Sequence, residues 1–513
     1  MPLRRRSFLA SAAAAGSALG LGIKASSAQP SGGFSFDDVI AEAQGRAAAP
    51  HVETRPLVGP FWRGLNYDQH RAIRFLPDRA LWQNDRHLSL QFFHVGLFFQ
   101  HPVMINLVEN GQAVPLRFDP NHFDYGLLDV PDHAEDPTGY AGFRVHYPIN
   151  TPDWADEFAV FLGASYFRLI GRDQVYGISA RGLAVDTAEP RPEEFPAFTD
   201  YWIEVPEPDA TELTVMALLD SPSVAGAYRF RLQPGSRTIA EVDAALFTRR
   251  QAKFGIAPLT SMFMKGEMSD DRFDDFRPEI HDSDGLSVLT ANGEWLWRPL
   301  TNRRVLQTTS FLDRDVQGFG LFQRDRSFAS YQDLEARYDR RPSLWVEPTR
   351  PFGPGRVELV EIPTEREIED NIVAYWVPDA PLGPGDRLDV SYRLSAIGDD
   401  TSIPPIGRTI SNRVGTDRRP GIEDQIPPDG RLFVIDFAGG ELASIGADQP
   451  VEPVVEASTG MLANVTAVRN EPARGWRVFF DLLPDGNLPC ELRCRLVLGV
   501  RPITETWSLL WLP

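Results

Sequence analysis

Short strand-like runs separated by glycine and proline are the feature that most limits the folds open to this chain. Examples are residues 88–95, 158–162 and 213–219. Such runs recur about every ten residues, the spacing expected of a β-sandwich. The 41 glycines and 43 prolines are scattered along the chain, as many strand–turn boundaries require. The sequence therefore predicts an all-β protein.

One short segment near the start departs from this texture. Residues 36–43 have the apolar spacing of a helix, and Ser35 or Asp37 is a suitable N-cap residue. We expect a single short helix ahead of the strands.

The first 28 residues indicate export. Arg5 and Arg6 precede Phe8 and Leu9, which is the twin-arginine pattern, with an ordinary secretory signal as the alternative. The apolar stretch that follows is alanine-rich and shorter than the roughly 20 strongly apolar residues of a membrane span. Small residues up to Ala28 suit a signal peptidase. These features predict a periplasmic protein with no stable membrane insertion.

Charge and motifs exclude several classes of function. The net charge of −20 argues against nucleic acid as a partner, because nucleic acids are bound through lysine and arginine. The sequence has no phosphate loop, dinucleotide fingerprint or His-Glu-x-x-His motif. Residues 282–285 begin like a calcium loop but lack its later glutamate. We therefore expect neither a cofactor nor a metal.

The two cysteines, Cys490 and Cys494, are predicted to be unbridged. On one strand, a four-residue offset separates them by about 13 Å. A disulfide needs Cα atoms within about 7 Å of each other.

A polar stretch rich in proline and glycine, residues 398–430, predicts a linker. The segment beyond it has about the size of an immunoglobulin-like sandwich, roughly 100 residues. The strands expected there are 432–437, 451–457, 464–469, 476–482, 491–500 and 504–512. The predicted organisation is a signal peptide at 1–28, a large β-sandwich domain at 34–397, the linker at 398–430 and the immunoglobulin-like β-sandwich at 431–513.

Carboxylates and aromatic rings, the side chains that sugar chemistry uses, are the candidates for function. Asp282 and Asp284 flank a serine beside a turn, and an Asx-type turn closed by Gly285 is the structural alternative. Asp370 precedes an apolar strand, where partial burial would raise its pKa. For Asp370 the alternative is a turn that begins the strand.

A third segment, residues 338–348, combines ring faces with hydrogen-bond donors. Tyr338 and Arg341 are its candidate site residues, and the alternative is a loop held by an Arg–Asp pair with Trp345 in the core. Candidate platforms for sugar rings are Trp295, Trp297, Trp345 and Trp376, each with a core position as its alternative.

Several segments resemble one known family. These are the export signal and residues 91–94, 141–145, 161–168, 176–184, 256–263, 280–284 and 341–348. They resemble, in the same order, the OpgG/OpgD (MdoG/MdoD) family of osmoregulated periplasmic glucan biosynthesis proteins. The resemblance runs from about residue 35 to the end of the chain, and the twin-arginine start looks more like the OpgD branch.

The resemblance implies a large β-sandwich followed by an immunoglobulin-like domain, and an enzyme. The implied activity is an anomer-inverting glycoside hydrolase that cuts linear β-1,2-glucan internally, or a related transglycosylase. Carried over by position, Asp370 is the general acid, Asp282 the general base, and Tyr338 part of a proton relay. Asp284 and Arg341 would contact the sugar.

The resemblance also implies partners and leaves one alternative function open. Linear β-1,2-glucan is the implied ligand, and a homodimer and a functional link to a membrane glucan synthase are compatible with the family. The alternative is a non-catalytic glucan-binding or scaffolding protein that assists the synthase. Residues 265–277 and 401–429 differ from relatives, so the preferred chain length and the choice between water and sugar as acceptor stay open.

Overall fold

Two large β-sheets that face each other form the body of the protein. The computed structural model describes residues 33–131, 134, 137–269, 272–400, 402–416 and 429–513. The predicted signal peptide lies outside these residues. The first sheet has ten strands within the described ranges. Its path is β2 (Ser89–Phe93), β6 (Gly142–Thr151), β7 (Trp154–Leu162), β8 (Tyr166–Leu169), β9 (Ser179–Arg181), β15 (Phe254–Ser261), β24 (Ile372–Pro378), β23 (Gly355–Glu361) and β20 (Gln307–Asp313), with β10 (Leu183–Val185) paired to β15.

The second sheet continues from the body into the C-terminal region, with fifteen strands among the described residues. Its path is β28 (Val451–Ala457), β31 (Cys490–Leu498), β33 (Thr506–Trp511), β19 (Trp295–Pro299), β18 (Gly285–Leu289), β21 (Gly318–Phe322), β22 (Ser343–Pro348), β25 (Arg387–Ile397), β14 (Thr238–Thr248), β13 (Val224–Gln233), β12 (Leu213–Asp220), β11 (Ala197–Glu204), β3 (Met104–Glu109) and β4 (Gln112–Pro115), with β32 (Arg501–Pro502) paired to β31. β19 and β33 join the two parts through a parallel pair, Trp297 opposite Trp507.

Smaller elements complete the chain. A four-stranded sheet consists of β26 (Arg408–Gly415), β27 (Arg431–Ala438), β30 (Gly475–Leu483) and β29 (Met461–Asn470). Two short pairs are β1 (Arg74–Phe75) with β5 (Phe123–Asp124) and β16 (Phe263–Lys265) with β17 (Ile280–His281). The helices are α1 (Phe36–Ala47), α2 (Pro60–Arg63), α3 (Tyr67–Ala72) and α4 (Phe328–Tyr331), with 3₁₀ turns η1 (Pro77–Arg79), η2 (Pro120–His122), η3 (Tyr338–Arg340) and η4 (Leu442–Ser444).

Aromatic side chains fill the space between the two large sheets. Phe143 on β6 meets Tyr201 on β11 with ring centroids 5.1 Å apart, and Phe161 on β7 meets Phe230 on β13 at 5.2 Å. Rings from both inner faces thus interdigitate, which is the packing of a β-sandwich. The prediction of an all-β sandwich protein is confirmed.

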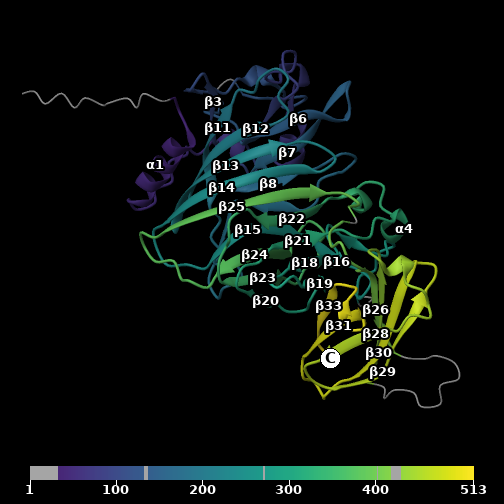
Figure 1. Cartoon of the computed structure of the whole chain (residues 1–513). Helices are drawn as coiled ribbons and strands as arrows, with labels where there is room; N and C mark the ends of the chain where they lie inside the picture. The colour runs from purple at the N-terminus through teal and green to yellow at the C-terminus, as the bar shows by residue number, and fades with distance from the viewer. Residues whose placement is uncertain (1–32, 132–133, 135–136, 270–271, 401, 417–428) are drawn as a thin grey trace, which may run out of the picture. The chain divides into compact units, whose positions relative to one another are not determined.

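A second apolar core lies in the C-terminal region. Phe433 and Phe480 of the four-stranded sheet pack against Trp507 on β33, with Cys490 and Cys494 also buried there. Both cysteines are free, as predicted, because they lie on the single strand β31. Figure 1 shows these strands in yellow beside β19.

The predicted linker contains a strand. Residues 408–415 form β26, which pairs along its length with β27, so the C-terminal sheets begin well before residue 431. Residues 417–428 of the predicted linker lie outside the described ranges. Phe34–Pro513 form one compact unit. The division into two domains therefore stays a prediction. Because β26 pairs with β27, any C-terminal domain would have to begin before Arg408.

Helix α1 confirms the predicted helix, whereas the shorter helices α2, α3 and α4 were not predicted. Helix α1 covers the outer face of the second sheet (Figure 1). Ser35 is its N-cap and forms a capping box with Asp38. Val39 and Ala43 pack on the sheet beside Met216 and Leu218 of β12.

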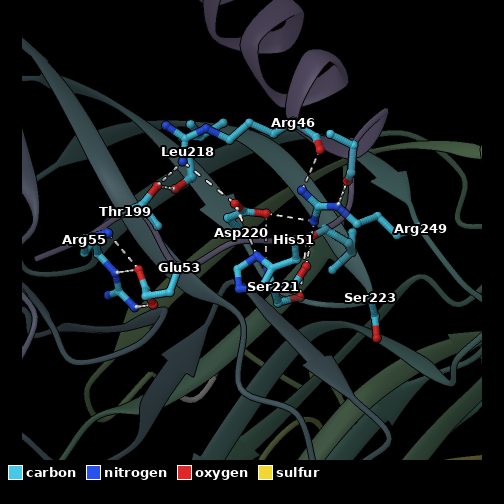
Figure 2. A network of polar contacts seen from close by, with 12 residues as sticks. Arg46, His51, Glu53, Arg55, Thr199, Leu218, Asp220, Ser221, Ser223 and Arg249 are labelled. Carbon is cyan, nitrogen blue, oxygen red and sulfur yellow. Dashed lines mark hydrogen bonds and ion pairs between the residues drawn. The ribbon is translucent and has the colours of Figure 1, made fainter. Parts of the chain in front are cut away.

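A buried ionic cluster fastens the C-terminal end of α1 to the sheet (Figure 2). Asp220, at the end of β12, binds Arg249 at 2.7 Å and lies 3.8 Å from Arg46 and 3.5 Å from the His51 ring. Arg249 also donates to the carbonyl oxygens of Arg46 and Ala49, at 2.7 and 3.0 Å. A guanidinium there satisfies backbone acceptors that a helix end leaves open.

His94, which follows β2, is buried among aromatic rings. It is 4% exposed, with ring centroids 4.6 Å from Trp62 and 4.9 Å from Phe123. Its Nδ1 lies 2.6 Å from the carbonyl oxygen of Val95. Burial lowers the pKa of His94 to about 4. The folded protein therefore holds a neutral imidazole that the unfolded chain would protonate near pH 6.5.

We expect this histidine to make the fold sensitive to acid. Its folded pKa is depressed, so stability is highest above pH 6.5 and falls as the pH approaches 4. Between pH 7.5 and 4.5 the wild type should lose about 2–3 kcal/mol of unfolding free energy more than His94→Gln does. Urea denaturation at both pH values measures this difference, with the exposed His87→Gln as the control. Equal pH losses in wild type and His94→Gln would contradict the assignment.

Candidate functional site

Asp282 stands directly after the short strand β17, in a buried position. Its backbone N–H donates to the carbonyl oxygen of Met262, 2.8 Å away, which fixes the chain beside β16. Its side chain is nearly enclosed and forms an ion pair with Arg341. One carboxylate oxygen of Asp282, Oδ1, is thus paired with the guanidinium of Arg341.

Arg341 is the centre of the site. Its guanidinium carbon lies 4.1 Å from the ring centroid of Tyr338, and its Nε and one terminal nitrogen donate to the carbonyl oxygen of Ala336. Gly177 packs against its stem: a Cβ there would lie 2.8 Å from Cδ of Arg341. Burial lowers the pKa of Arg341 to about 10, so it is still a cation at neutral pH.

Tyr338, the first residue of η3, is held by Glu367. The tyrosine hydroxyl donates to a carboxylate oxygen of Glu367. Arg277 binds both oxygens of that carboxylate, at 3.0 and 2.8 Å, and also binds Asp333 at 2.7 Å. Burial, reinforced by the nearby Glu367, raises the pKa of Tyr338, which therefore stays protonated as a donor.

Asp370 is presented by a clamp formed by the next residue. Asn371 is buried, and its amide oxygen accepts from the backbone N–H of Phe263 at 2.8 Å. Its amide nitrogen donates to the carbonyl oxygens of Phe263 and Ile362 at 3.0 and 2.9 Å. The turn that begins β24 is therefore tied to β16, and Asp370 is positioned by it.

The carboxylate of Asp370 is reached by solvent although protein surrounds it. The surrounding protein raises its pKa by desolvation, while the guanidinium groups of Arg168, Arg181 and Arg341 oppose that rise. Arg341 thus acts on Asp370 and binds Asp282, so the structure brings four of the predicted residues together. They are Asp282, Tyr338, Arg341 and Asp370.

Sequence reasoning missed several residues of this site. Arg168 donates to the Ser179 hydroxyl at 2.7 Å, and Arg181 binds Glu193 at 2.8 Å. The guanidinium of Arg181 also lies over the ring of Tyr166, 5.5 Å from its centroid. Arg168 and Arg181 fall in segments that resemble the family, which was the one available signal for them.

Asp284 lines a small cavity whose lining does not include Arg341. Its carboxylate accepts from the backbone N–H groups of Arg324 and Asp325, both at 2.9 Å, and burial raises its pKa to about 6. The cavity also contains His281 and has a volume of about 40 Å³, which suits a few water molecules rather than a sugar ring. The Asp284 carboxylate is therefore held by the backbone of residues 324 and 325, and not by a turn closed by Gly285.

Buried His281 is doubly hydrogen-bonded beside Asp284. Its Nε2 lies 2.8 Å from Glu279, and its Nδ1 lies 2.9 Å from the amide oxygen of Gln323. The Gln323 nitrogen donates to two carbonyl oxygens, so its oxygen must accept from the histidine. Burial opposes protonation, but Glu279, Asp284 and Gln323 together outweigh it and raise the pKa of His281.

The candidate tryptophans are packing residues in this structure. Trp376 is 0% exposed in the main core, and Trp297 and Trp345 are 3% and 2% exposed in the C-terminal core. Trp295 is half-buried and stacks on Trp345, with ring centroids 5.5 Å apart. Neither Trp345 nor Trp376 presents a face that a sugar could reach, so neither belongs to the proposed site.

The site contains carboxylates, guanidinium groups and tyrosine hydroxyls side by side. Such a set both donates and accepts hydrogen bonds, and its charges largely compensate one another. Within the described ranges, no group of three or more His, Cys, Asp or Glu side chains is arranged to hold a metal ion. The fold and site define an all-β protein with a polar site suited to a neutral ligand rich in hydroxyl groups.

Comparison with known proteins places the chain in a family. The family described as "Periplasmic glucan biosynthesis protein, MdoG" matches residues 34–511. The chain is 47% identical over 495 residues to "Glucans biosynthesis protein G" of Ralstonia nicotianae, covering 95% of this chain and 98% of that protein. It is 44% identical to the protein of that name from Vibrio cholerae (94% and 87% covered). It is 43% identical to "Probable glucans biosynthesis protein D" of Shewanella oneidensis (94% and 89%). The chain belongs to the MdoG family of periplasmic glucan biosynthesis proteins.

These comparisons correct the prediction of an enzyme. The relatives are named as glucans biosynthesis proteins, and none of those names states a glycoside hydrolase or transglycosylase activity. The assignment of Asp282 as a general base and Asp370 as a general acid is accordingly withdrawn.

The family is periplasmic by its description. Among the residues that the structure describes, no helix is both long and apolar enough to cross a membrane.

Proposed function

We propose that this protein binds a glucan chain in the periplasm and so takes part in glucan biosynthesis. The observation that carries this proposal is the position of Arg341, which pairs with Asp282 and packs on the ring of Tyr338. Beside it, Asp370 presents a solvent-reached carboxylate whose charge interacts with that of Arg341. Sugar hydroxyls donate to carboxylates and accept from guanidinium groups, and hydrogen bonds to charged partners are the stronger ones. The half-buried Tyr166 adds a ring beside Arg181, while the buried Tyr338 supports Arg341 from below rather than facing the ligand.

The ligand we propose is linear β-1,2-glucan. The family resemblance supports this linkage, and the compensated charges of the site support a neutral polymer. In this proposal the protein holds the polymer for a membrane glucan synthase, after export by the twin-arginine route. A homodimer is compatible with this role.

Replacing Asp370 by asparagine tests the proposal. The variant keeps the shape of the side chain but loses a charged acceptor, so we expect glucan binding to weaken by about 10–100-fold. Titration calorimetry of the mature protein, from about Gln29, with linear β-1,2-glucan measures the affinity.

Two controls make the test specific. Asp389→Asn changes an exposed carboxylate that lines a cavity beside Phe36 of α1, and it should bind glucan like the wild type. A β-1,4-linked glucan of equal length should bind more weakly than the β-1,2-linked polymer. Unchanged binding in Asp370→Asn would show that this site does not hold the glucan.

A further inference from the structure

Two exposed phenylalanine rings share one cavity at the edge of the site. Phe98 is 82% exposed and Phe195 is 51% exposed. Single exposed apolar side chains are ordinary, but large rings gathered in one hollow mark a binding surface. Both rings line a cavity of about 210 Å³, together with Arg55, Gln100 and His101.

The cavity fits a small neutral ligand. Its volume is below the roughly 300–1,000 Å³ of sites for drug-sized molecules, so it suits one sugar residue or two. Among the described residues that line it, Arg55 is the permanent charge, and Arg55 is bound to Glu53 at 2.7 Å. Hydrogen bonding from Arg55 lowers the pKa of Glu53 to about 2, so the pair is ionised and compensated.

The chemistry of the lining matches a pyranose ring. The C–H faces of such a ring are apolar and pack on the face of an aromatic side chain. The polar groups of Gln100 and His101 lie at the same cavity, where hydroxyls at the ring edge would need partners. The imidazole of His101 is oriented by a 3.2 Å contact of its Nδ1 with the carbonyl oxygen of Arg55.

The cavity adjoins the Asp370 site through Arg181. The guanidinium of Arg181 lies 5.6 Å from the ring centroid of Phe195 and 5.5 Å from that of Tyr166, and it acts on the Asp370 carboxylate. One side chain thus borders both places.

The turn between β7 and β8 also links the cavity to the site. Gly163 and Ala164 line the cavity, and Tyr166 follows two residues later. Ala164 has a φ of 36°, a left-handed conformation that costs energy for a residue with a Cβ. Such conformations gather at ligand sites, where the surrounding structure holds them.

We propose that Phe98 and Phe195 form a second sugar subsite, which takes a pyranose ring of the same glucan chain that occupies the Asp370 site. This inference rests on the proposed function and extends it, because it makes the protein a reader of glucan length. A glucan long enough to reach both places should bind more tightly than one that fills only the first.

Truncation of the two rings tests the subsite. Affinities for linear β-1,2-glucans of two to three units and of ten or more units are measured for wild type, Phe98→Ala, Phe195→Ala and the double variant. We expect each truncation to weaken binding of the long glucan about tenfold and to leave the short glucan unchanged. Because both rings are exposed, the variants should fold like the wild type.

The controls separate this inference from the proposed function. Trp154→Ala removes an exposed ring at the start of β7, outside the cavity, and should bind both glucans normally. Phe195→Tyr keeps the ring and should retain long-glucan affinity. If Asp370→Asn weakens binding while the double phenylalanine variant does not, the subsite is refuted and the proposed function stands. If Asp370→Asn binds both glucans like the wild type, the proposed function itself fails.

Discussion

Glu505→Gln should remove about 3–5 kcal/mol of stability, because it leaves a buried arginine without its counter-charge. Arg324 binds both oxygens of Glu505, at 2.6 and 3.0 Å, and both side chains are nearly inaccessible to solvent. The guanidinium carbon of Arg324 also lies 3.5 Å from the ring centroid of Trp297, so it cannot turn toward water without losing that contact. Glutamine can still accept from the N–H of Thr409, but it carries no charge.

The loss should be felt at the site as well as in overall stability. The backbone N–H of Arg324 holds Asp284, which follows Asp282 by two residues. We therefore expect faster amide hydrogen exchange at Arg324 and Asp325 in Glu505→Gln, besides a lower urea midpoint.

A surface pair of the same kind supplies the control for Glu505. Glu441 binds Arg501 through two nitrogens, but both side chains are exposed. Exposed pairs contribute about 0–1 kcal/mol, so Glu441→Gln should be close to neutral. If the two variants lose equal stability, burial does not set the strength of the Arg324–Glu505 pair.

Local sequence signals were enough to predict several strands and the longest helix. Predicted strand 476–482 corresponds to β30, and 451–457 to β28, because alternation and turn residues are properties of a short window. Ser35 caps α1 for the same reason, since a cap depends on residues within one turn.

The linker shows where local signals fail. Residues 408–415 look polar and irregular, yet they form β26 because β27 offers a full set of hydrogen-bonding partners. Pairing with a distant strand overrides weak local preference.

The sequence was enough to name the carboxylates of the site, but not the arginines around them. The charge of Arg181 acts on Asp370 because β9 pairs with β8 and puts Arg181 opposite Tyr166, a register that no single segment encodes. Trp376 was misjudged as a candidate platform because β24 lies between β15 and β23. A central strand can be buried on both faces, so exposure could not be inferred from its composition.

Asp220→Asn should also cost about 3–5 kcal/mol and should loosen helix α1 first. Asp220 is buried and is the carboxylate that compensates Arg249, at 2.7 Å, with Arg46 and His51 beside it (Figure 2). An asparagine would leave the guanidinium of Arg249 without that charge and could turn an N–H₂ group toward it. Arg249 also holds the carbonyl oxygens of Arg46 and Ala49, so the end of the helix would lose its anchor.

Hydrogen exchange and denaturation together distinguish this effect from general destabilisation. In Asp220→Asn, amides of α1 should exchange faster under native conditions than amides of β13 and β14, because the helix rests on these strands without belonging to the sheet. Asp389→Asn, which alters an exposed pair with Arg387, should shift neither measurement by more than about 1 kcal/mol. Uniform acceleration across α1 and the sheet would instead mean that Asp220 stabilises the sandwich as a whole. No change at all would mean that the backbone contacts of Arg249, and the contacts of Arg46 with Glu42 and Asp200, are sufficient to hold the helix end.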